Sequence, residues 1–525
     1  MLHNSLDPAL ARNPEHLVVH GGAGRAIRSW EAFDLTSEAL RTLEPDETLL
    51  VQSGMPVARF RTDLMAPRVL LAHSIVVPAW ASAEEFRTLE ARGLTTEGRI
   101  AAGAWLYTGL RSFLATAFEA VSELADQHFD GSLASRLVVT SGLGASGAAQ
   151  APAIKMAKGT ALIAEADAAR IDALQTLGVF DHRMDDLDQA IEMAVGLKST
   201  GTAEAIVWHG NGVDMLARLS ERGVVPDVVT DMTGGLDSGG TYVSQGLDAA
   251  EAQTLAGSSP RQYESQATES VAKHLQLMIE LRDAGAMAFE FGNALRAQAE
   301  LAGVAEAFEI PGFYSAFVRR RVLEGRSPIG VVALTGERGD VDAIEEKLAE
   351  VAHDDTRLLR YLELLRATPM GEQGLPSQTF WLRYQDHVAL GLQVNRMVRD
   401  QDVQGPVLIF RGPLDPGTVT SPFRETEQMP DGSDAVADWP VLAGMLAAAS
   451  GATWVSLGHG GGAGIGFSLH SSVAMLANGS PEADQRIERV LTQDPAFGLM
   501  RYAAAKDPEA AATAKAARLP LFGAS

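Results

Sequence analysis

Three glycines follow a run of β-branched residues in the stretch VVTSGLGASG, at the spacing Gly142-x-Gly144-x-x-Gly147. In dinucleotide sites the first such glycine permits a tight turn and the second lets the backbone approach a pyrophosphate. Glu165 ends the next predicted strand, where a carboxylate accepts hydrogen bonds from ribose hydroxyls and favours NAD over NADP. Arg170 lies close by and would instead suit a 2′-phosphate, and a tight strand–helix turn without a ligand is a further alternative. The context of the motif predicts a dinucleotide site.

A second glycine-rich stretch, SLGHGGGAGIGFSLH, occupies residues 456–470 and carries His459 and His470. Consecutive glycines let the backbone lie close to a flat ligand. His459 is our first candidate for handling a proton or hydrogen-bonding a ring. A histidine that only caps loop backbone is the alternative. The preceding SGATWVSL is predicted to be a buried strand that fixes the start of this loop.

Further candidates for chemistry are scattered along the chain. Asp415 in LDPG could pair with a ring N–H, although a turn-forming aspartate is the competing interpretation. His20 and Tyr107 are weaker candidates for proton transfer. The RETE segment at 424–427 is interpreted as a buried salt-bridge network, within which Arg424 could hold a substrate carboxylate. Because the histidines are dispersed, no metal site is expected.

The elements that must position the glycine loop alternate between strands and helices. Short apolar runs are followed by helical segments, a pattern typical of a parallel sheet with helices on both faces. Buried strands are also expected before the loop, the first of them with a Gly-Met-Pro turn. We predict strands over 47–60, 68–77, 159–166, 204–209, 226–231 and 286–291, and helices over 110–127, 147–158, 183–198, 211–223 and 260–284.

The expected fold class is α/β, with a discontinuous core domain and an inserted Rossmann-like, doubly wound NAD-binding domain. At 525 residues the chain is too long for one ordinary core. The alternation extends over 128–340, so this range is assigned to the NAD-binding domain. Residues 1–127 and 341–525 are expected to combine into the core domain, because neither flank shows a complete alternation on its own.

Composition excludes several classes of protein. The chain has no cysteine, which excludes disulfides, thiolate zinc sites, iron–sulfur ligation and cysteine nucleophiles. The formal net charge is −24 and the acidic residues are spread out, which argues against a nucleic-acid partner. No long apolar run and no signal-like start are found, so we expect a cytoplasmic protein without a membrane partner.

Over nearly its whole length, from about residue 13 to 505, the chain resembles the urocanase (urocanate hydratase) family. The order and length of the matching stretches make the resemblance specific. They are VVHGGAGRAIRSWEAF (18–33), ETLLVQSGMPVARFRT (47–62), RGVVPDVVTD (222–231), FGNALR (291–296), PGF (311–313), QGLP (373–376), RETEQMPDGSDAVADWPVL (424–442) and SGATWVSLGHGGGAGIGFSLH (450–470).

The resemblance implies a homodimeric hydro-lyase that acts on a small-molecule substrate. In this family a tightly held NAD⁺ serves as an electron sink and carries no hydride, while water adds to the imidazole ring of the substrate and its acrylate side chain is protonated. Carried over by matched position, the NAD contacts are Gly21, Gly22, Arg111, Ala145, Ser146, Gly147, Glu165, Arg170, Asn211, Gly212, Thr233, Gly234, Tyr242, Val243, Phe291 and Gly498.

Several positions depart from the family's pattern. The family's active-site Cys in H-L-D-C-G-S is Pro416 here, and its His is Pro413. The Lys of Q-S-G-K-P is Met55, the Arg of L-P-A-R is Gln378, and the Gln near GAWLYTG is Arg111. Replacing Lys by Met and Cys by Pro makes a pocket wall less polar, which suits an imidazole ring with an extra apolar group.

The chain therefore looks more like family relatives that act on S-methyl thiourocanate, in the breakdown of thiohistidine betaines such as ergothioneine. The residues predicted to line the substrate pocket are Met55, Gln378, Pro416 and Arg424. One alternative is a urocanate hydratase of histidine degradation. The other is a catalytically inactive NAD-binding homologue that serves as a sensor or a partner subunit.

Overall fold

The computed structural model describes residues 1–235, 241–292, 295–411, 414–461 and 463–522, so Pro413 and Gly462 lie outside the described residues. The chain divides into two compact units. The core unit comprises 1–116, 319–363 and 372–525, and the inserted unit comprises 117–318 and 364–371. Among the described residues, every helix is too short or too polar to cross a bilayer.

A six-stranded sheet forms the centre of the inserted unit, and its strands pair in parallel in the order β11-β10-β6-β7-β9-β8. Every residue of β6 and β7 is buried, as expected of parallel strands covered on both faces. The strands are β6 (Leu137–Ser141), β7 (Thr160–Glu165), β8 (His182–Met184), β9 (Ala205–His209), β10 (Val228–Val229) and β11 (Met287–Ala288). The predicted α/β fold with a parallel sheet is confirmed.

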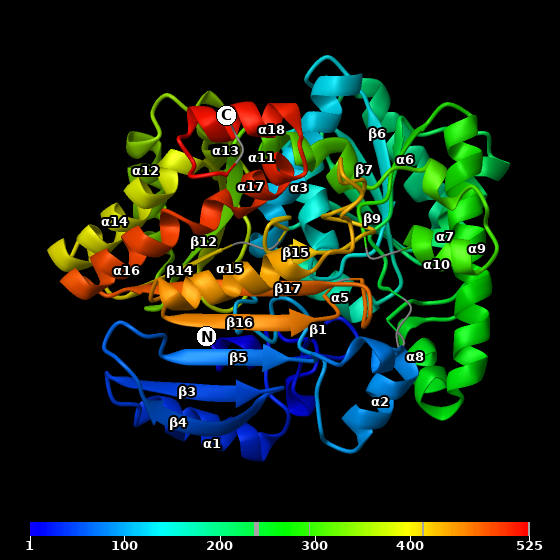
Figure 1. Cartoon of the computed structure of the whole chain (residues 1–525). Helices are drawn as coiled ribbons and strands as arrows, with labels where there is room; N and C mark the ends of the chain where they lie inside the picture. Colours follow the sequence, from blue (N-terminus) through cyan, green and yellow to red (C-terminus); the bar gives the residue numbers. More distant parts are fainter. Residues whose placement is uncertain (236–240, 293–294, 412–413, 462, 523–525) are drawn as a thin grey trace. The chain divides into compact units, whose positions relative to one another are not determined.

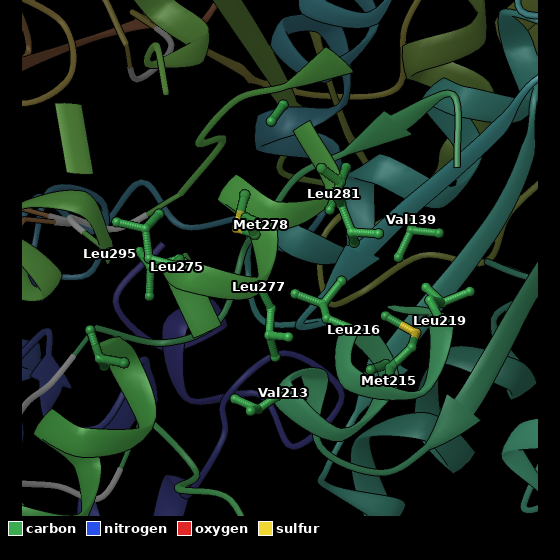
Figure 2. Close-up of a cluster of buried hydrophobic side chains, with 14 of the residues drawn as sticks. Val139, Val213, Met215, Leu216, Leu219, Leu275, Leu277, Met278, Leu281 and Leu295 are labelled. Atoms are coloured by element: carbon green, nitrogen blue, oxygen red, sulfur yellow. The ribbon is translucent and has the colours of Figure 1, made fainter. Parts of the chain in front are cut away.

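Helices pack on this sheet through apolar side chains. In Figure 2, Leu216 and Leu219 of α7 lie in one cluster with Leu275 and Met278 of α9, and all four are buried. Four of the helices have an N-cap side chain that accepts backbone N–H groups of the first turn. These are Asp167 for α5, Asp186 for α6, Asn211 for α7 and Asp248 for α8. The helices are α3 (Arg111–His128), α4 (Gln150–Met156), α5 (Ala168–Thr176), α6 (Leu187–Thr200), α7 (Gly212–Glu221), α8 (Ala249–Ser258), α9 (Pro260–Asp283) and α10 (Leu295–Leu301).

The strand order of the inserted unit reverses at β6. From β6 the chain continues to β7 on one side, and after β9 it crosses to β10 on the other side of β6. The carboxyl ends of β6 and β10 therefore form a topological switch point, the place where open α/β sheets bind ligands. The glycine loop follows β6, and Asp231 follows β10.

Nine strands form a mixed sheet in the core unit, in the order β13-β12-β14-β17-β16-β5-β3-β4 with β15 paired to β17. Figure 1 shows β16, β5, β3 and β4 side by side. The strands are β3 (Glu47–Gln52), β4 (Met55–Arg61), β5 (Val69–His73), β12 (Arg326–Ala333), β13 (Ser377–Arg383), β14 (Val407–Arg411), β15 (Val419–Thr420), β16 (Trp454–His459) and β17 (Leu469–Ala477). A separate pair consists of β1 (Val18–His20) and β2 (Gly24–Arg25).

Serine side chains cap the N-termini of some helices of the core unit. Ser29 and Ser480 accept the backbone N–H of the residue three positions on, at the starts of α1 and α16. The helices are α1 (Trp30–Arg41), α2 (Ala83–Ala91), α11 (Arg319–Leu323), α12 (Arg338–Val351), α14 (Tyr384–Asp400), α15 (Asp438–Ala449), α16 (Pro481–Leu491), α17 (Phe497–Ala504) and α18 (Pro508–Ala516). A further helix, α13 (Thr356–Ala367), contributes residues to both units.

The structure differs from the sequence-based prediction in three details. β12 lies within the range 128–340 that was assigned to the NAD-binding domain, yet it pairs antiparallel with β13 and β14 in the core sheet. The compact units accordingly divide after residues 116 and 318. Several elements were not predicted, among them α5, β8, α8 and α10 of the inserted unit, and the turn within 47–60 falls at Ser53 and Gly54, so that Met55 begins β4.

Candidate functional site

The glycine loop after β6 uses its three glycines in different ways. Gly142 has a φ of +87°, and a Cβ there would lie 2.4 Å from the carbonyl oxygen of Met232. A Cβ on Gly147 would lie 2.2 Å from the carbonyl oxygen of Gly142. A Cβ on Gly144 would meet no heavy atom within 4 Å. The protein's own packing therefore requires glycine at 142 and 147, whereas at 144 the loop faces open space.

Glu165 joins the end of β7 to the glycine loop. Its Oε2 accepts the backbone N–H of Leu143 at 2.6 Å, and its Oε1 accepts that of Asp167 at 2.9 Å. The guanidinium of Arg170 donates to Oε1 of Glu165 at 3.0 Å and lies 3.4 Å from Oδ2 of Asp167. The predicted pair Glu165 and Arg170 thus lies directly beside the loop, with Arg170 engaged by two carboxylates.

The loop after β9 is fixed by Asn211. Its Oδ1 accepts the N–H of Val213 at 2.9 Å and caps α7, while its Nδ2 donates to the carbonyl of Val243 at 2.8 Å. A Cβ on Gly212 would lie 2.3 Å from Oγ of Ser141 at the end of β6. Three predicted contact residues, Asn211, Gly212 and Val243, therefore meet next to the strand that leads into the glycine loop.

The loop after β10 is held by a carboxylate. Asp231 accepts the N–H of Thr233 at 3.1 Å and its hydroxyl at 2.8 Å. A Cβ on Gly234 would lie 2.1 Å from Cγ2 of Thr241. Of the other predicted contacts, Ala145 and Ser146 are half-buried in the glycine loop, Tyr242 is buried, and Phe291 stacks on Phe313 with ring centroids 4.5 Å apart.

Three histidines of the core unit meet at one edge of its sheet. His73 ends β5, His459 ends β16 and His470 lies at the start of β17, and the pairing places His73 and His470 on either side of Gly458. A Cβ on Gly458 would lie 2.4 Å from Nε2 of His470. Burial lowers the pKa of His73 to about 4 and that of His470 to about 3, so both rings are neutral at pH 7. Within the described part of the chain, no cluster of three or more His, Asp or Glu side chains is arranged to hold a metal ion.

His459 is bound to backbone through both ring nitrogens. Its Nδ1 lies 3.2 Å from the carbonyl oxygen of Ser74, and its Nε2 accepts the N–H of Gly466 at 2.9 Å. These partners require the proton on Nδ1, and burial lowers the pKa of the ring. The geometry thus favours the alternative interpretation, a neutral histidine that holds the loop 460–468 in place.

Turn geometry accounts for glycines in this loop. Gly460, Gly464 and Gly466 have φ values between +89° and +94°. A Cβ on Gly461 would lie 2.6 Å from Oγ of Ser468. Close approach of a ligand is therefore not needed to explain glycine at these four positions.

His20 and Tyr107 lie together, with ring centroids 4.6 Å apart. Burial and the nearby charge of Arg99 lower the pKa of His20 to about 3. The predicted contacts Gly21 and Gly22 follow directly, and a Cβ on Gly21 would lie 3.3 Å from Cζ of Arg99. The two weaker proton-transfer candidates thus share one location beside the first predicted glycine contact.

Asp415, Pro416 and Gly498 also lie together. A Cβ on Gly498 would lie 3.0 Å from Oδ1 of Asp415 and 3.2 Å from Cδ of Pro416, and Arg501 donates to the carbonyl of Pro416 at 2.9 Å. Oδ1 of Asp415 accepts the N–H of Gly417 at 2.7 Å, as in a turn, while Oδ2 is buried without a hydrogen-bond partner among the described residues. Burial raises the pKa of Asp415 to about 6, against the attraction of nearby arginines.

Arg111 and Gln378 form a buried polar pair. Arg111 donates to Oε1 of Gln378 at 3.0 Å and lies 3.1 Å from the carboxylate of Glu372. Nε2 of Gln378 donates to the hydroxyl of Tyr361 at 2.8 Å. The two positions at which the family's Gln and Arg are replaced are therefore direct neighbours.

The remaining pocket candidates are placed separately. Arg424 forms an ion pair of 2.8 Å with the buried Glu425, and its charge contributes to the lowered pKa of His470. Met55 is half-buried at the start of β4. Gln378 lies on β13, with β12 and β14 between it and β17. The RETE segment contains the ion pair of Arg424 with its neighbour Glu425, whereas the sequence predicted a buried salt-bridge network.

Sequence reasoning missed two buried residues of the inserted unit, Asp231 and His274. Each is 1% exposed, and Nε2 of His274 lies 3.6 Å from Oδ1 of Asp231. The aspartate in DVVTD, directly after a buried strand, was a usable signal. His274 in α9 carried none, because only the fold brings it to the end of β10.

Three family models match consecutive parts of the chain. The urocanase N-terminal domain matches residues 1–106, the urocanase Rossmann-like domain matches 112–317, and the urocanase C-terminal domain matches 322–516. Together they cover nearly all of the chain. The Rossmann-like match coincides with the inserted unit and its parallel sheet.

Proposed function

Because the chain belongs to the urocanase family, we propose that it is an NAD⁺-dependent hydratase that adds water to a urocanate-type imidazole acrylate. The Rossmann-like domain of the family is its NAD-binding domain. The proposed substrate is S-methyl thiourocanate, and the proposed NAD⁺ is tightly bound.

The observation that carries the proposal is the open space at Gly144. A loop that served only as a tight turn would need glycine at positions 142 and 147, where a Cβ collides with backbone. Nothing in the inserted unit requires glycine at 144, since a Cβ there meets no atom within 4 Å. A ligand that approaches the backbone closely supplies the missing reason, and the loop lies at the switch point where dinucleotides bind. The loop thus fits a dinucleotide.

Glu165 and Arg170 support NAD over NADP. Glu165 ends β7, where a carboxylate is suited to ribose hydroxyls. Arg170 is the cation that could have met a 2′-phosphate, but it donates to Glu165 and lies 3.4 Å from Asp167. A 2′-phosphate would have to displace these carboxylates from Arg170 and would also be repelled by them.

Bound NAD⁺ would supply an electron sink for the imidazole ring. The chain itself would bind and orient the substrate and protonate its acrylate side chain. We assign proton donation to Asp415, whose burial raises its pKa to about 6 and whose Oδ2 has no partner among the described residues. A carboxyl group with a pKa near the working pH is suited to donate and recover a proton. We assign His459 a structural role in holding the loop after β16, because both of its ring nitrogens are hydrogen-bonded to backbone groups.

The assignment of an active enzyme is supported by Arg111 and Gln378. The family's Gln and Arg are replaced by Arg and Gln at two positions that share a hydrogen bond of 3.0 Å. The exchange keeps one guanidinium and one amide in the same pair. Independent decay of an inactive homologue would not be expected to preserve this composition.

The substrate assignment rests on polarity. Met55 and Pro416 replace a Lys and a Cys of the family pattern, and Pro416 is buried against Gly498. Loss of these polar groups favours an apolar substituent on the imidazole ring, such as the S-methyl group of S-methyl thiourocanate.

The cofactor proposal is tested by denaturing the purified protein and measuring NAD⁺ in the supernatant. We expect close to one NAD⁺ per subunit without any being added. Gly144→Val should abolish retention and have the melting temperature of wild-type protein stripped of NAD⁺, because a side chain there meets no protein atom and only the ligand's stabilisation is lost. Gly196→Ala is the matched control, since it also faces open space but lies within α6, away from the loop.

Two results would overturn the cofactor proposal. One is a supernatant without nucleotide, combined with no binding when NAD⁺ is added. The other is full retention of NAD⁺ by the Gly144→Val variant, which would show that the open space is not where the dinucleotide lies.

A further inference from the structure

A buried polar cluster lies where β6 and β10 end, and it contains groups that the predicted NAD contacts do not include. Asp231 and His274 are 3.6 Å apart and each is 1% exposed. Ser141, also 1% exposed, ends β6. A Cβ on Gly212 would lie 2.3 Å from Oγ of Ser141 and 3.3 Å from Cε1 of His274. The loops after β6, β9 and β10 and the helix α9 therefore meet at this cluster.

The cluster is costly for stability alone. Both ring nitrogens of His274 and Oγ of Ser141 have no hydrogen-bond partner among the described residues. Buried polar atoms without partners destabilise a fold, and apolar side chains of the same shape would fill this space at lower cost. A role in the neighbouring site explains their presence better than packing does.

Asp231 connects this cluster to the loop that follows β10. Its two oxygens accept the N–H and the hydroxyl of Thr233, at 3.1 Å and 2.8 Å. The same loop touches the glycine loop, since a Cβ on Gly142 would collide with the carbonyl oxygen of Met232. A change at Asp231 therefore reaches two loops that are predicted to hold the dinucleotide.

The groups that face Asp231 are His274 from α9, Glu290 after β11, and Tyr242. Arg296 is bonded to Glu290 at 2.5 Å and offsets its charge. Burial raises the pKa of Asp231 to about 7 and lowers that of His274 to about 4. Burial also raises the pKa of Glu290, against the attraction of Arg296, so Asp231 and Glu290 are the two acids here whose pKa values are shifted towards neutral pH, and Asp231 is the one that holds Thr233.

We propose that Asp231 and His274 are positioning residues that make dinucleotide binding depend on the protonation of their buried pair. This inference rests on the NAD site proposed above. As a carboxylate, Asp231 accepts both hydrogen bonds from Thr233 and holds the loop in place. Once Asp231 takes a proton, one of its oxygens becomes a donor, so the hydrogen bond from the hydroxyl of Thr233 must reverse its direction and the loop is less well fixed.

The test is retention of NAD⁺ by the whole protein after extended dialysis at pH values from about 5.5 to 8.5, measured as NAD⁺ per subunit. Wild-type protein should retain NAD⁺ about tenfold more weakly below pH 7 than above it, the size of one hydrogen bond to a charged group. Asp231→Asn resembles the protonated acid and should show weak retention at every pH. His274→Phe keeps a ring but removes the polar neighbour of the carboxylate, so its transition should move to higher pH.

Thr230→Val is the matched control. Its Oγ1 is buried without a hydrogen-bond partner among the described residues, and it directly precedes Asp231. This variant should keep the wild-type pH profile, because it changes neither charge nor the bonds to Thr233. If Asp231→Asn does not fold, the inference is decided by whether the transition in NAD⁺ retention moves to higher pH in His274→Phe.

The inference is overturned if wild-type retention is independent of pH, or if Asp231→Asn or His274→Phe keeps the wild-type profile. In that case NAD⁺ is still present and the proposed function stands. If no variant and no wild-type protein binds NAD⁺ at any pH, the proposed function fails and this inference fails with it.

Discussion

At the residue scale, the hydrogen bond between Arg111 and Gln378 supports the proposal that the site is retained. Because the two side chains are in contact at 3.0 Å, we expect each substitution to compensate for the other. Arg111→Gln should destabilise the protein by about 1–3 kcal/mol, because Glu372 loses an ion-pair partner. Gln378→Arg should be similarly harmful, because it places two guanidinium groups side by side.

The reciprocal double variant, Arg111→Gln with Gln378→Arg, should be more stable than either single variant. A coupling energy of about 0.5–3 kcal/mol is the usual range for residues in contact. Thermal unfolding of the four proteins measures it. Losses that simply add in the double variant would contradict compensation between the two positions.

Asp415 makes a separate prediction about pH. If its carboxyl donates the proton, kcat should fall as the pH rises through about 6, where the group ionises. Asp415→Asn should lower kcat by about 10²–10⁴-fold and leave NAD⁺ content unchanged. The initial rate across pH 5–9 checks the first point, and the denaturation assay checks the second. Asp415→Asn with wild-type kcat would remove Asp415 from proton transfer.

The same carboxyl predicts a dependence of stability on pH. Its folded-state pKa is raised above the unfolded value, so its stabilising contribution is complete at low pH and is lost as the pH rises through about 6. Asp415→Asn stays neutral at every pH. Its melting temperature relative to wild type should therefore rise between pH 5 and pH 8.

At the level of elements, the loop 460–468 depends on a histidine whose role differs from the first interpretation. His459→Phe removes both bonds to Ser74 and Gly466. It should destabilise the protein by about 1–3 kcal/mol and raise KM, while kcat changes by less than about tenfold. Steady-state kinetics with thermal unfolding measures both effects. A thousandfold fall in kcat with unchanged stability would instead show that His459 takes part in proton transfer.

The sequence predicted the strand–glycine loop–strand unit because its signals are local. The turn at Gly142, the helix after it and Glu165 at the end of β7 all lie within one supersecondary motif. The predicted range 128–340 includes β12, because an apolar strand can belong to either sheet and only its pairing with β13 and β14 decides which. His274 was missed for a similar reason, since only the fold brings α9 to the end of β10, whereas Asp231 had a local signal that was not used.

At the scale of the whole molecule, we propose a homodimer that uses α15. This helix is apolar on its packed side and also exposes Leu442, Met445 and Leu446, which are 53%, 60% and 38% exposed. Their spacing of three and four residues places them on one face of the helix. An exposed apolar face of this kind is typical of a protein interface.

Leu442→Arg with Met445→Arg should therefore convert a dimer to a monomer. Light scattering after size-exclusion chromatography gives the mass directly. The control is Leu35→Arg on α1, an equally exposed position at 51% that lies on another helix. A monomeric wild-type protein, or a dimer that survives the double change, would contradict this interface.

The central claim is that this chain is an NAD⁺-dependent hydratase with a preference for a substituted urocanate. The most direct measurement follows the loss of acrylate ultraviolet absorbance with S-methyl thiourocanate and with urocanate side by side, using protein of known NAD⁺ content. We predict loss of absorbance with both or with the substituted compound alone, and a higher kcat/KM for S-methyl thiourocanate by about 10–200-fold, the usual value of one apolar group. Equal or faster turnover of urocanate would contradict the substrate preference, and turnover of neither compound by NAD⁺-loaded protein would contradict the hydratase itself.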